Sequence, residues 1–181
     1  MVAGSILPIC LHNGKLCFLF GKENPMENSA KGFSDFGGRV EKNETIFAAA
    51  LREGTEELTG FLGSKNQLKK LIQKQGPTLN HVHKKYHVHM FHYPYNEDFV
   101  KFYNNNHAFL WNAMDKDVLN KSKLFEKIEI QWFHEDELMS KLTMFRPFYR
   151  EIVMQLYDRK SEIRDYLQKT QKQNTTRKKR V

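Results

Sequence analysis

The chain has 181 residues, of which 40% are hydrophobic and 13% aromatic, including 14 phenylalanines. This length and composition fit a single domain with a proper core and exclude a disordered chain. No apolar run reaches the roughly 20 residues of a membrane-spanning helix, and residues 1–10 lack the pattern of a secretory signal. We therefore expect a soluble, intracellular protein of the cytoplasm with no membrane partner.

The net charge of +8 is concentrated at the C-terminus. Six basic residues and no acidic residue lie between Lys169 and Arg180. We expect a single domain over residues 1–168, followed by a basic, flexible tail over residues 169–181. Such a tail can bind RNA, polyphosphate or an acidic partner, or act as a nuclear address; a frayed, solubilising terminus is the alternative.

The N-terminal half predicts a hairpin that leads through a loop into a helix. Apolar residues flank Asn13-Gly14, the preferred two-residue hairpin turn, and Asn43 or Thr45 can cap the helix. We expect a hairpin over residues 5–20, a loop over 23–32, a strand over 33–36, a helix over 45–58 and a short helix over 67–75.

The C-terminal half mixes further strands with helices. We expect a hairpin over residues 78–95, a helix over 96–103, a turn at 104–106, an extended piece at 109–111, a strand over 127–133, a short helix over 134–142 and a long helix over 145–168. Mixed strands with helices on both sides predict the α/β class, as a three-layer α/β/α sandwich with a mixed sheet.

Cys10 and Cys17 flank the predicted turn of the first hairpin. A disulfide between them is geometrically open, but buried free thiols are the expectation for an intracellular protein.

Histidines gather in the second predicted hairpin, which holds five of the eight: His81, His83, His87, His89 and His92. Their spacing places pairs of them on common strand faces, so a zinc site is conceivable. No cysteine joins them, and we favour surface or substrate-facing groups.

Three carboxylates cluster within the stretch Gly37–Gly60. Glu53, Glu56 and Glu57 stand at helical spacings that place them on one side of a single turn. Like charges this close destabilise a helix unless a cation lies among them. Gly37 and Gly38 free the backbone before the helix, so a carbonyl can join the carboxylates as a hard oxygen donor. The stretch therefore predicts a divalent-metal site rather than a solvated acidic face.

The spacing of Gly38, Glu44, Arg52-Glu53 and Glu56-Glu57 resembles the signature of the Nudix hydrolases. The chain departs from that signature at two positions. Gly54 stands where a bulky aliphatic residue is usual, which costs about 1 kcal/mol of helix propensity relative to alanine. Thr59 stands where glycine is usual, with Gly60 one place later, which predicts a helix about one residue longer.

The resemblance implies the Nudix α/β/α fold and a role for each residue of the motif. Mg²⁺ or Mn²⁺ would polarise the phosphate, activate water and neutralise the leaving group. Glu53 and Glu57 are the implied metal ligands, Glu56 a third ligand or the base, the Gly37 carbonyl the backbone ligand, and Arg52 with Glu44 the pair that orients the cluster.

A further acidic residue outside the motif completes the site in many such enzymes. Glu129 is the first candidate, because it lies on the strand predicted to carry Trp132, and Glu126 is the second. The alternative is that both are polar residues of a half-buried strand.

The resemblance leaves the substrate open. The family cleaves a diphosphate linkage in nucleoside diphosphate derivatives, and the segments SDFGG, REGTEELTGFLG, YNNN and FRPFYREI look most like Nudix proteins of large DNA viruses, some of which remove mRNA caps. We expect a nucleotide or capped RNA substrate. The alternatives are an inositol pyrophosphate, which Lys84-Lys85 and the histidines would suit, and a non-catalytic binding or sensor protein, which has no need of crowded carboxylates.

Overall fold

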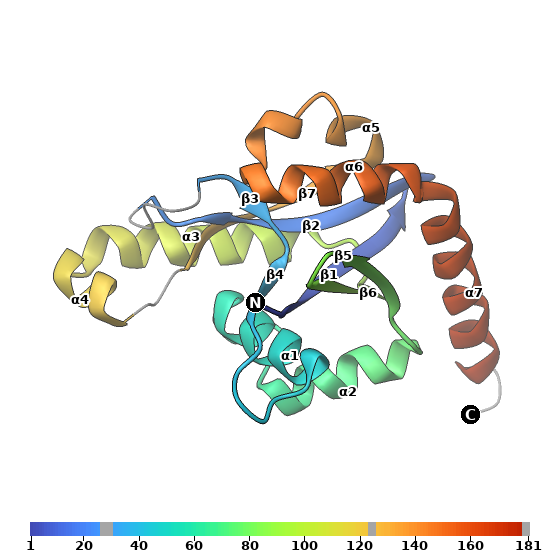
Figure 1. The fold of residues 1–181 in the computed structure, drawn as a ribbon, viewed down its shortest axis with the longest axis horizontal. Coiled ribbons are helices and arrows are strands. Elements are labelled where there is room, and N and C mark those ends of the chain that lie inside the picture. Colours follow the sequence, from blue (N-terminus) through green and yellow to red (C-terminus); the bar gives the residue numbers. More distant parts are fainter. Residues whose placement is uncertain (26–30, 123–125, 179–181) are drawn as a thin grey trace.

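The computed structural model describes residues 1–25, 31–122 and 126–178 (Figure 1). The strands in these residues are β1 (Ala3–His12), β2 (Lys15–Glu23), β3 (Phe33–Ser34), β4 (Phe36–Arg39), β5 (Leu79–His83), β6 (Tyr86–His92) and β7 (Lys127–His134). The helices are α1 (Ile46–Glu57), α2 (Lys65–Gln75), α3 (Glu97–Ala113), α4 (Lys116–Ser122), α5 (Glu135–Leu138), α6 (Arg150–Asp158) and α7 (Lys160–Lys178), with 3₁₀ turns η1 (Leu142–Met144) and η2 (Pro147–Tyr149). None of the described helices is long and apolar enough to cross a membrane.

The strands form one mixed sheet in the order β3-β2-β1-β6-β5, with β4 also paired to β1 and β7 to β2. β6 runs parallel to β1, and the other pairs are antiparallel. β1 and β2 are paired next to their turn and then separate, because β4 pairs the start of β1 and β3 pairs the end of β2. The segment from Phe33 to Arg39 therefore fills a split between β1 and β2.

The two-residue turn predicted at Asn13-Gly14 in the first hairpin is confirmed. Asn13 and Gly14 both have positive φ angles, of 49° and 74°, as a two-residue turn of this kind requires. Cys10 and Cys17 lie opposite each other in the β1–β2 register and are buried free thiols, as expected.

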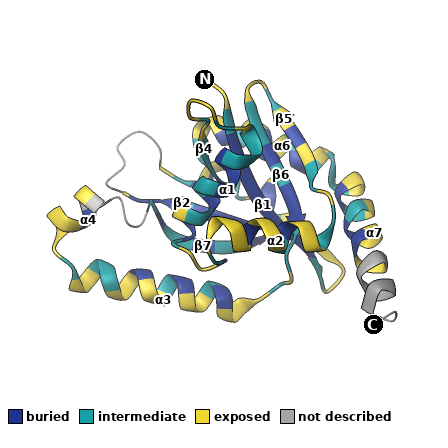
Figure 2. Cartoon of the chain, turned by 90° about the horizontal axis from the view of Figure 1, so that it is seen from below, coloured by how far each residue is buried: buried dark blue, intermediate teal, exposed yellow. Residues whose placement is uncertain are grey.

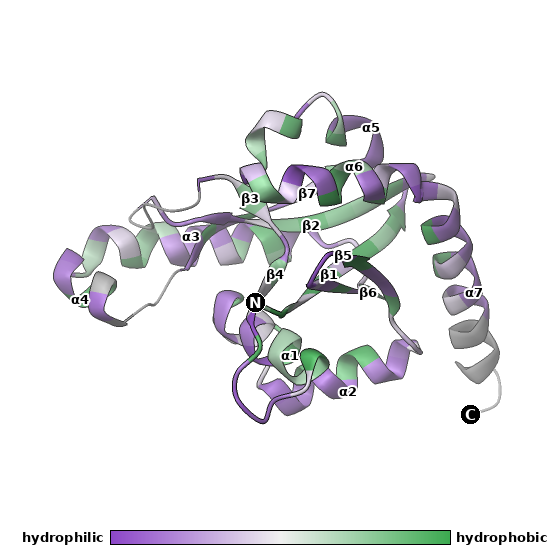
Figure 3. Ribbon diagram, in the orientation of Figure 1, coloured by the Kyte–Doolittle hydropathy of each residue, from purple (hydrophilic) through white to green (hydrophobic). Residues whose placement is uncertain are grey.

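Alternate residues of β1 enter two separate cores, one on each face of the sheet. Leu7 and Ile9 pack with α6 and α7, whereas Ile6 and Cys10 pack with α1, α2 and α3. Buried residues concentrate in the central strands and exposed ones on the outer sides of the helices (Figure 2). The hydropathy of the chain follows the same pattern, with apolar β1 and β2 between largely polar helices (Figure 3). The predicted three-layer sandwich is confirmed.

The helix predicted over residues 96–103 is confirmed, but the predicted turn at 104–106 and extended piece at 109–111 are wrong, because α3 is one continuous helix from Glu97 to Ala113. The expected turn at residues 104–106 lies inside it. The Asn104 side chain donates to the carbonyl of Ile130 and accepts from its backbone N–H, at 3.0 and 2.8 Å. These bonds to β7 occupy the amide group that would otherwise favour a turn. α4 was not predicted at all.

The single C-terminal helix predicted over residues 145–168 is also wrong. The chain instead forms η2, α6 and α7, with a break at Arg159, where α7 turns away from α6 (Figure 1). The Arg159 guanidinium contacts Asn80, His81 and Glu162, which ties the break to β5. The helix predicted over 134–142 is shorter, since α5 ends at Leu138.

α7 continues to Lys178, so the basic residues Lys169 and Lys172 lie on a helix, and Thr170 beside them is buried. The domain boundary at residue 168 and the flexible tail stay predictions. Residues 26–30 of the predicted loop, and residues 179–181, lie outside the described part of the chain.

Candidate active site

α1 carries the acidic motif and packs closely on the sheet. Thr45 caps it, since its hydroxyl accepts from the N–H of Ala48, and the cap is therefore Thr45 rather than Asn43. A Cβ at position 54 would lie 2.4 Å from Cδ1 of Ile6, on β1. Gly54 therefore lets the helix approach β1 more closely than a larger residue would, and its place in the motif has a packing reason that propensity alone does not reveal.

The C-terminus of α1 differs from the prediction. The helix ends at Glu57 and not one residue later. Thr59 itself adopts the left-handed conformation, with a φ of 47°, and the N–H groups of Thr59 and Gly60 return to the carbonyls of Glu56 and Thr55. This pair of bonds is a Schellman motif, in which Thr59 takes the position that glycine usually occupies.

Arg52 brings three carboxylates of the motif together. Its guanidinium binds both oxygens of Glu44 at 3.2 and 3.0 Å, Oε1 of Glu53 at 2.7 Å and Oε2 of Glu56 at 3.4 Å. A further bond to the carbonyl of Arg39 attaches the same guanidinium to the end of β4. One planar cation thus fixes the orientation of the cluster relative to the sheet.

Glu53 lies against the backbone of β4. A Cβ at position 38 would come within 2.4 Å of its carboxylate, so Gly38 leaves the space that Glu53 occupies. Burial raises the pKa of Glu53, although Arg52 opposes the shift. The pKa of Glu44 is lowered by its hydrogen bonds to Arg52. Arg52 therefore does not fully offset the cost of burying the charged form of Glu53.

Glu57 is the most buried carboxylate of the motif. Its Oε2 accepts from the N–H of Gly37 at 2.8 Å, and its Oε1 lies 3.5 Å from Nζ of Lys127. Burial raises the pKa of Glu57 well above its ordinary value, although the charge of Lys127 opposes the shift. Gly37, the predicted backbone ligand, is thereby held beside the carboxylates.

Sequence reasoning missed the buried cation opposite Glu57. Lys127 lies at the start of β7 and is fully buried, with its Nζ 2.5 Å from Glu23 and 2.7 Å from the Ser34 hydroxyl. Glu23 in turn accepts from Arg146. A chain of alternating charges thus runs from Arg146 through the split between β1 and β2 to Glu57.

The two acidic candidates outside the motif lie in different surroundings. Glu129 forms an ion pair with Lys22 of β2 at 3.1 Å, and both side chains are partly exposed. Glu126 lies close enough to Glu57 for its charge to raise the pKa of that carboxyl. The second candidate is therefore coupled to the motif.

The histidines of the β5–β6 hairpin bind different partners. His81 and His83 share the side chain of Gln155, and His83 also contacts Glu151. His89 and His92 contact Asn80 and Gln75. Within residues 1–25, 31–122 and 126–178, no three His, Cys, Asp or Glu side chains are arranged to hold a metal ion, so the zinc site has no support.

The motif nevertheless suits a divalent metal in its donor chemistry. Its carboxylates are hard oxygen ligands, and those of Glu53 and Glu57 keep raised pKa values beside Arg52 and Lys127. A cation would lower both pKa values. Glu56, the most exposed of the three, is open to water.

Comparison with known proteins identifies the family. The family model of the Nudix domain matches residues 3–156. The crystal structure of a C. elegans Ap4A hydrolase is 16% identical, covers 90% of this chain and 99% of its own, and gives a TM-score of 0.45. A binary complex of a C. elegans Ap4A hydrolase is 17% identical, with coverages of 52% and 68% and a TM-score of 0.33. Curated proteins give no match.

The similarity to these two structures is too low to assign a substrate. The match to the family model identifies the family without these two structures, since it spans most of the chain and contains β1, β4 and the whole of α1. The chain therefore belongs to the Nudix domain family and is a Nudix hydrolase.

Proposed function

We propose that the protein hydrolyses a diphosphate linkage in a nucleoside diphosphate derivative with the help of Mg²⁺ or Mn²⁺. The observation that carries the proposal is the carboxylate cluster of α1, which Arg52 orients and which Glu57 attaches to the backbone of Gly37. Glu53, Glu57 and the carbonyl of Gly37 would hold the metal, and Glu56 would be either a third ligand or the base. When bound, the metal would supply polarisation of the phosphate and activation of water.

The protein residues position the reacting groups. Arg52 keeps Glu53 and Glu56 on the side of α1 that faces the end of β4. Glu56 is exposed, so its carboxylate can accept the proton of the attacking water as the new P–O bond forms and the anhydride P–O bond breaks. Lys127 balances part of the charge of Glu57 and keeps that carboxylate in its buried place. We propose that Glu126 or Glu129 adds a further carboxylate, and favour Glu126 for its coupling to Glu57.

Substitutions by glutamine test the proposal, because they remove a charge and preserve the shape of the side chain. We expect Glu53→Gln and Glu57→Gln each to lower metal-dependent turnover by about 10²-fold or more. Glu162→Gln, on the exposed side of α7, is the matched control and retains activity. Thermal denaturation of each variant shows whether the fold persists, which matters most for Glu57, since Lys127 would lose one of its two carboxylate partners. Near-normal turnover by folded Glu57→Gln would contradict the proposal.

A substrate panel separates the alternatives. With Mg²⁺ or Mn²⁺, we expect release of a nucleotide from a nucleoside triphosphate, a dinucleoside polyphosphate or capped RNA. Release of inorganic phosphate from an inositol pyrophosphate alone would establish that alternative, and binding without turnover would establish a non-catalytic protein. Decapping, RNA contact by the basic C-terminal segment and a nuclear address stay predictions.

A further inference from the structure

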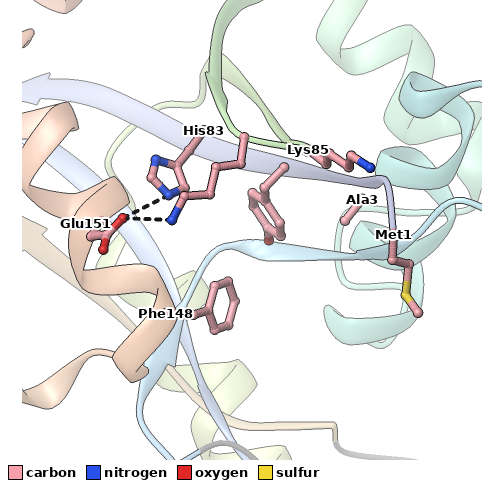
Figure 4. Close-up of a pocket in the computed structure, with 8 residues that line it drawn as sticks. Met1, Ala3, His83, Lys85, Phe148 and Glu151 are labelled. Carbon is pink, nitrogen blue, oxygen red and sulfur yellow. Dashed lines mark hydrogen bonds and ion pairs between the residues drawn. The ribbon is translucent and has the colours of Figure 1, made fainter.

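A cavity of about 410 Å³ lies between the start of β1, the β5–β6 turn, η2 and the first turn of α6, on the face of the sheet that α6 covers. His83 and Glu151 lie on one side of it, and Lys85 and Met1 on the other (Figure 4). None of its described lining residues belongs to the carboxylate motif. The contacts that hold the end of the motif helix lie on the opposite face of the sheet, where α3 packs against β7.

The hydroxyl of Tyr103, on α3, lies between the end of α1 and the start of β7. It is 2.7 Å from the carbonyl oxygen of Glu57 and 3.0 Å from that of Lys127, and it can donate to either. Tyr103 is fully buried, so water does not compete for these bonds. One hydroxyl therefore links the main chain of the most buried motif carboxylate to the main chain of the lysine that faces it.

The bond from Tyr103 completes the C-terminus of α1. The last four carbonyls of a helix have no partner within it. The Schellman motif occupies two of them. That of Glu57, the last residue of α1, accepts from Tyr103 instead. The position of the end of the motif helix is thus set by α3 as well as by the turn that follows the helix.

The ring that carries the hydroxyl is fixed by its neighbours. His107 stacks on it, with ring centres 3.9 Å apart, and Phe61 approaches it at 5.1 Å and an angle of 64°. One residue further along α3, the Asn104 side chain binds both backbone groups of Ile130 on β7. The ring therefore keeps one orientation, and the helix that carries it keeps one place on the sheet.

The ammonium of Lys127 is fixed independently of α1. Its Nζ is held by Glu23 and the Ser34 hydroxyl, at 2.5 and 2.7 Å. A Cβ at position 21 would lie 3.0 Å from Cγ and Cδ of Lys127, so Gly21 leaves room for the stem of the lysine. The distance of 3.5 Å between Nζ and Oε1 of Glu57 therefore depends on where α1 ends relative to β7. That spacing is the one which the tyrosine hydroxyl bridges.

We propose that Tyr103 is a positioning residue for Glu57: its hydroxyl fixes the end of α1 against β7 and thereby sets the place of the Glu57 carboxylate relative to Lys127. Glu126 precedes Lys127 in the chain, so the same bond also fixes the backbone beside the favoured further carboxylate. Tyr103 is buried and acts through Glu57 rather than on the substrate. The inference deepens the proposed function and rests on it, because it assigns a position that the reaction requires to a residue outside the motif.

Tyr103→Phe tests the inference, because it removes the hydroxyl and keeps the ring. We expect kcat to fall by about tenfold or more, with KM within about twofold of the wild type, because misplacing a group at the reacting centre affects the chemical step. We expect the dissociation constant of Mn²⁺ alone, measured by electron paramagnetic resonance without substrate, to rise by about tenfold. Both quantities are measured well below the melting temperature of each variant.

Two control variants separate the position of Glu57 from the stability of the fold. Tyr166→Phe makes the same substitution on α7, at a hydroxyl that donates to the carbonyl of Pro77 at 2.9 Å, and this ring packs on the other face of the sheet from α1. Ile152→Val lowers stability by shortening a fully buried side chain in the core on that same face. We expect both variants to retain the kcat and the Mn²⁺ affinity of the wild type.

Three results would overturn the inference. The first is a Tyr103→Phe variant with the kcat and Mn²⁺ affinity of the wild type. The second is a rise in KM alone, which would place Tyr103 in substrate binding. The third is an equal loss of kcat and Mn²⁺ affinity in Tyr103→Phe and Ile152→Val, which would make the effect one of stability.

The inference and the proposed function fail separately. If Glu57→Gln abolishes turnover while Tyr103→Phe matches the wild type in kcat and Mn²⁺ affinity, the positioning role is wrong and the proposed function stands. If the wild type binds Mn²⁺ but turns over no diphosphate substrate, and Tyr103→Phe lowers the affinity while the controls retain it, the positioning role stands and the proposed function is wrong. A wild type that neither binds Mn²⁺ nor turns over a substrate would overturn both.

Discussion

Replacing Gly54 by alanine has two opposite effects on stability: it raises the helix propensity of α1 and it crowds the packing of α1 against β1. Propensity alone predicts that alanine stabilises α1 by about 1 kcal/mol. The structure predicts the opposite sign, because the added Cβ would lie 2.4 Å from Cδ1 and 2.7 Å from Cγ1 of Ile6. Ile6 is fully buried, so its methyl group cannot move aside into solvent. Either the side chain leaves its rotamer or α1 moves away from β1.

The packing cost exceeds the propensity gain. Inserting a methyl group into a filled core costs about 1–3 kcal/mol. After subtraction of the propensity gain, we expect Gly54→Ala to unfold about 1 kcal/mol more easily, which lowers the melting temperature by about 2–4 °C for a chain of this size. The loss of activity should be larger than the loss of stability. Glu53 and Glu57 flank Gly54 on the same helix, and a displacement of about 1 Å can cost roughly 10²-fold in turnover.

A double-mutant cycle with Ile6→Val assigns the effect to this contact. Valine removes the δ-methyl group nearest to the new Cβ and alone costs about 0.5–1.5 kcal/mol. Urea denaturation and turnover are measured for the wild type, both single variants and the double variant. We expect the double variant to lose less stability than the sum of the losses of the two single variants, with a coupling free energy of about 1 kcal/mol. A Gly54→Ala variant that is more stable than the wild type, with additive effects, would refute the packing argument.

Two further substitutions test local features of the fold. Thr59→Gly should raise the melting temperature by about 2–4 °C, because it relieves about 1 kcal/mol of left-handed strain at a residue whose buried hydroxyl has no partner among the described residues; no gain in thermal denaturation would contradict this. His81→Gln should reduce the loss of stability in acid. Burial and the charge of Arg159 lower the pKa of His81, so below about pH 6.5 the unfolded chain binds a proton that the folded chain resists, and stability falls. Urea denaturation at pH 7.5 and 5.5 measures the loss of stability in the wild type and in His81→Gln. An identical loss in the two proteins would count against a role for His81.

Local sequence signals were sufficient to predict the elements whose conformation depends on residues close together in the sequence. Asn13-Gly14 predicted the first hairpin because few other residue pairs accept two successive positive φ angles. The cap at Thr45 and the apolar side of α1 predicted the start of the motif helix to within one residue. The spacing of Arg52 and its carboxylate neighbours likewise predicted a cluster, since residues three and four apart on a helix must be neighbours.

Tertiary contacts decided the elements that were predicted wrongly. The run Asn104–Asn106 favours a turn by composition, yet α3 passes through it because Asn104 bonds to both backbone groups of Ile130, 26 residues away. Arg159 lies in a stretch with helical periodicity, yet the helix breaks there and the guanidinium reaches β5. Neither partner can be identified from the residues beside it in the sequence.

The buried Lys127 weakens the inference that the carboxylate cluster requires a metal ion. The sequence argument for a metal was that crowded carboxylates repel unless a cation lies among them, but Arg52 and Lys127 already supply two such cations. Repulsion alone therefore no longer requires a metal. The remaining argument is that burial still raises the pKa of Glu53 and Glu57 in the presence of those cations. A divalent ion would stabilise the negative charge of these two carboxylates, at the place where a diphosphate must bind if the motif is to act on it.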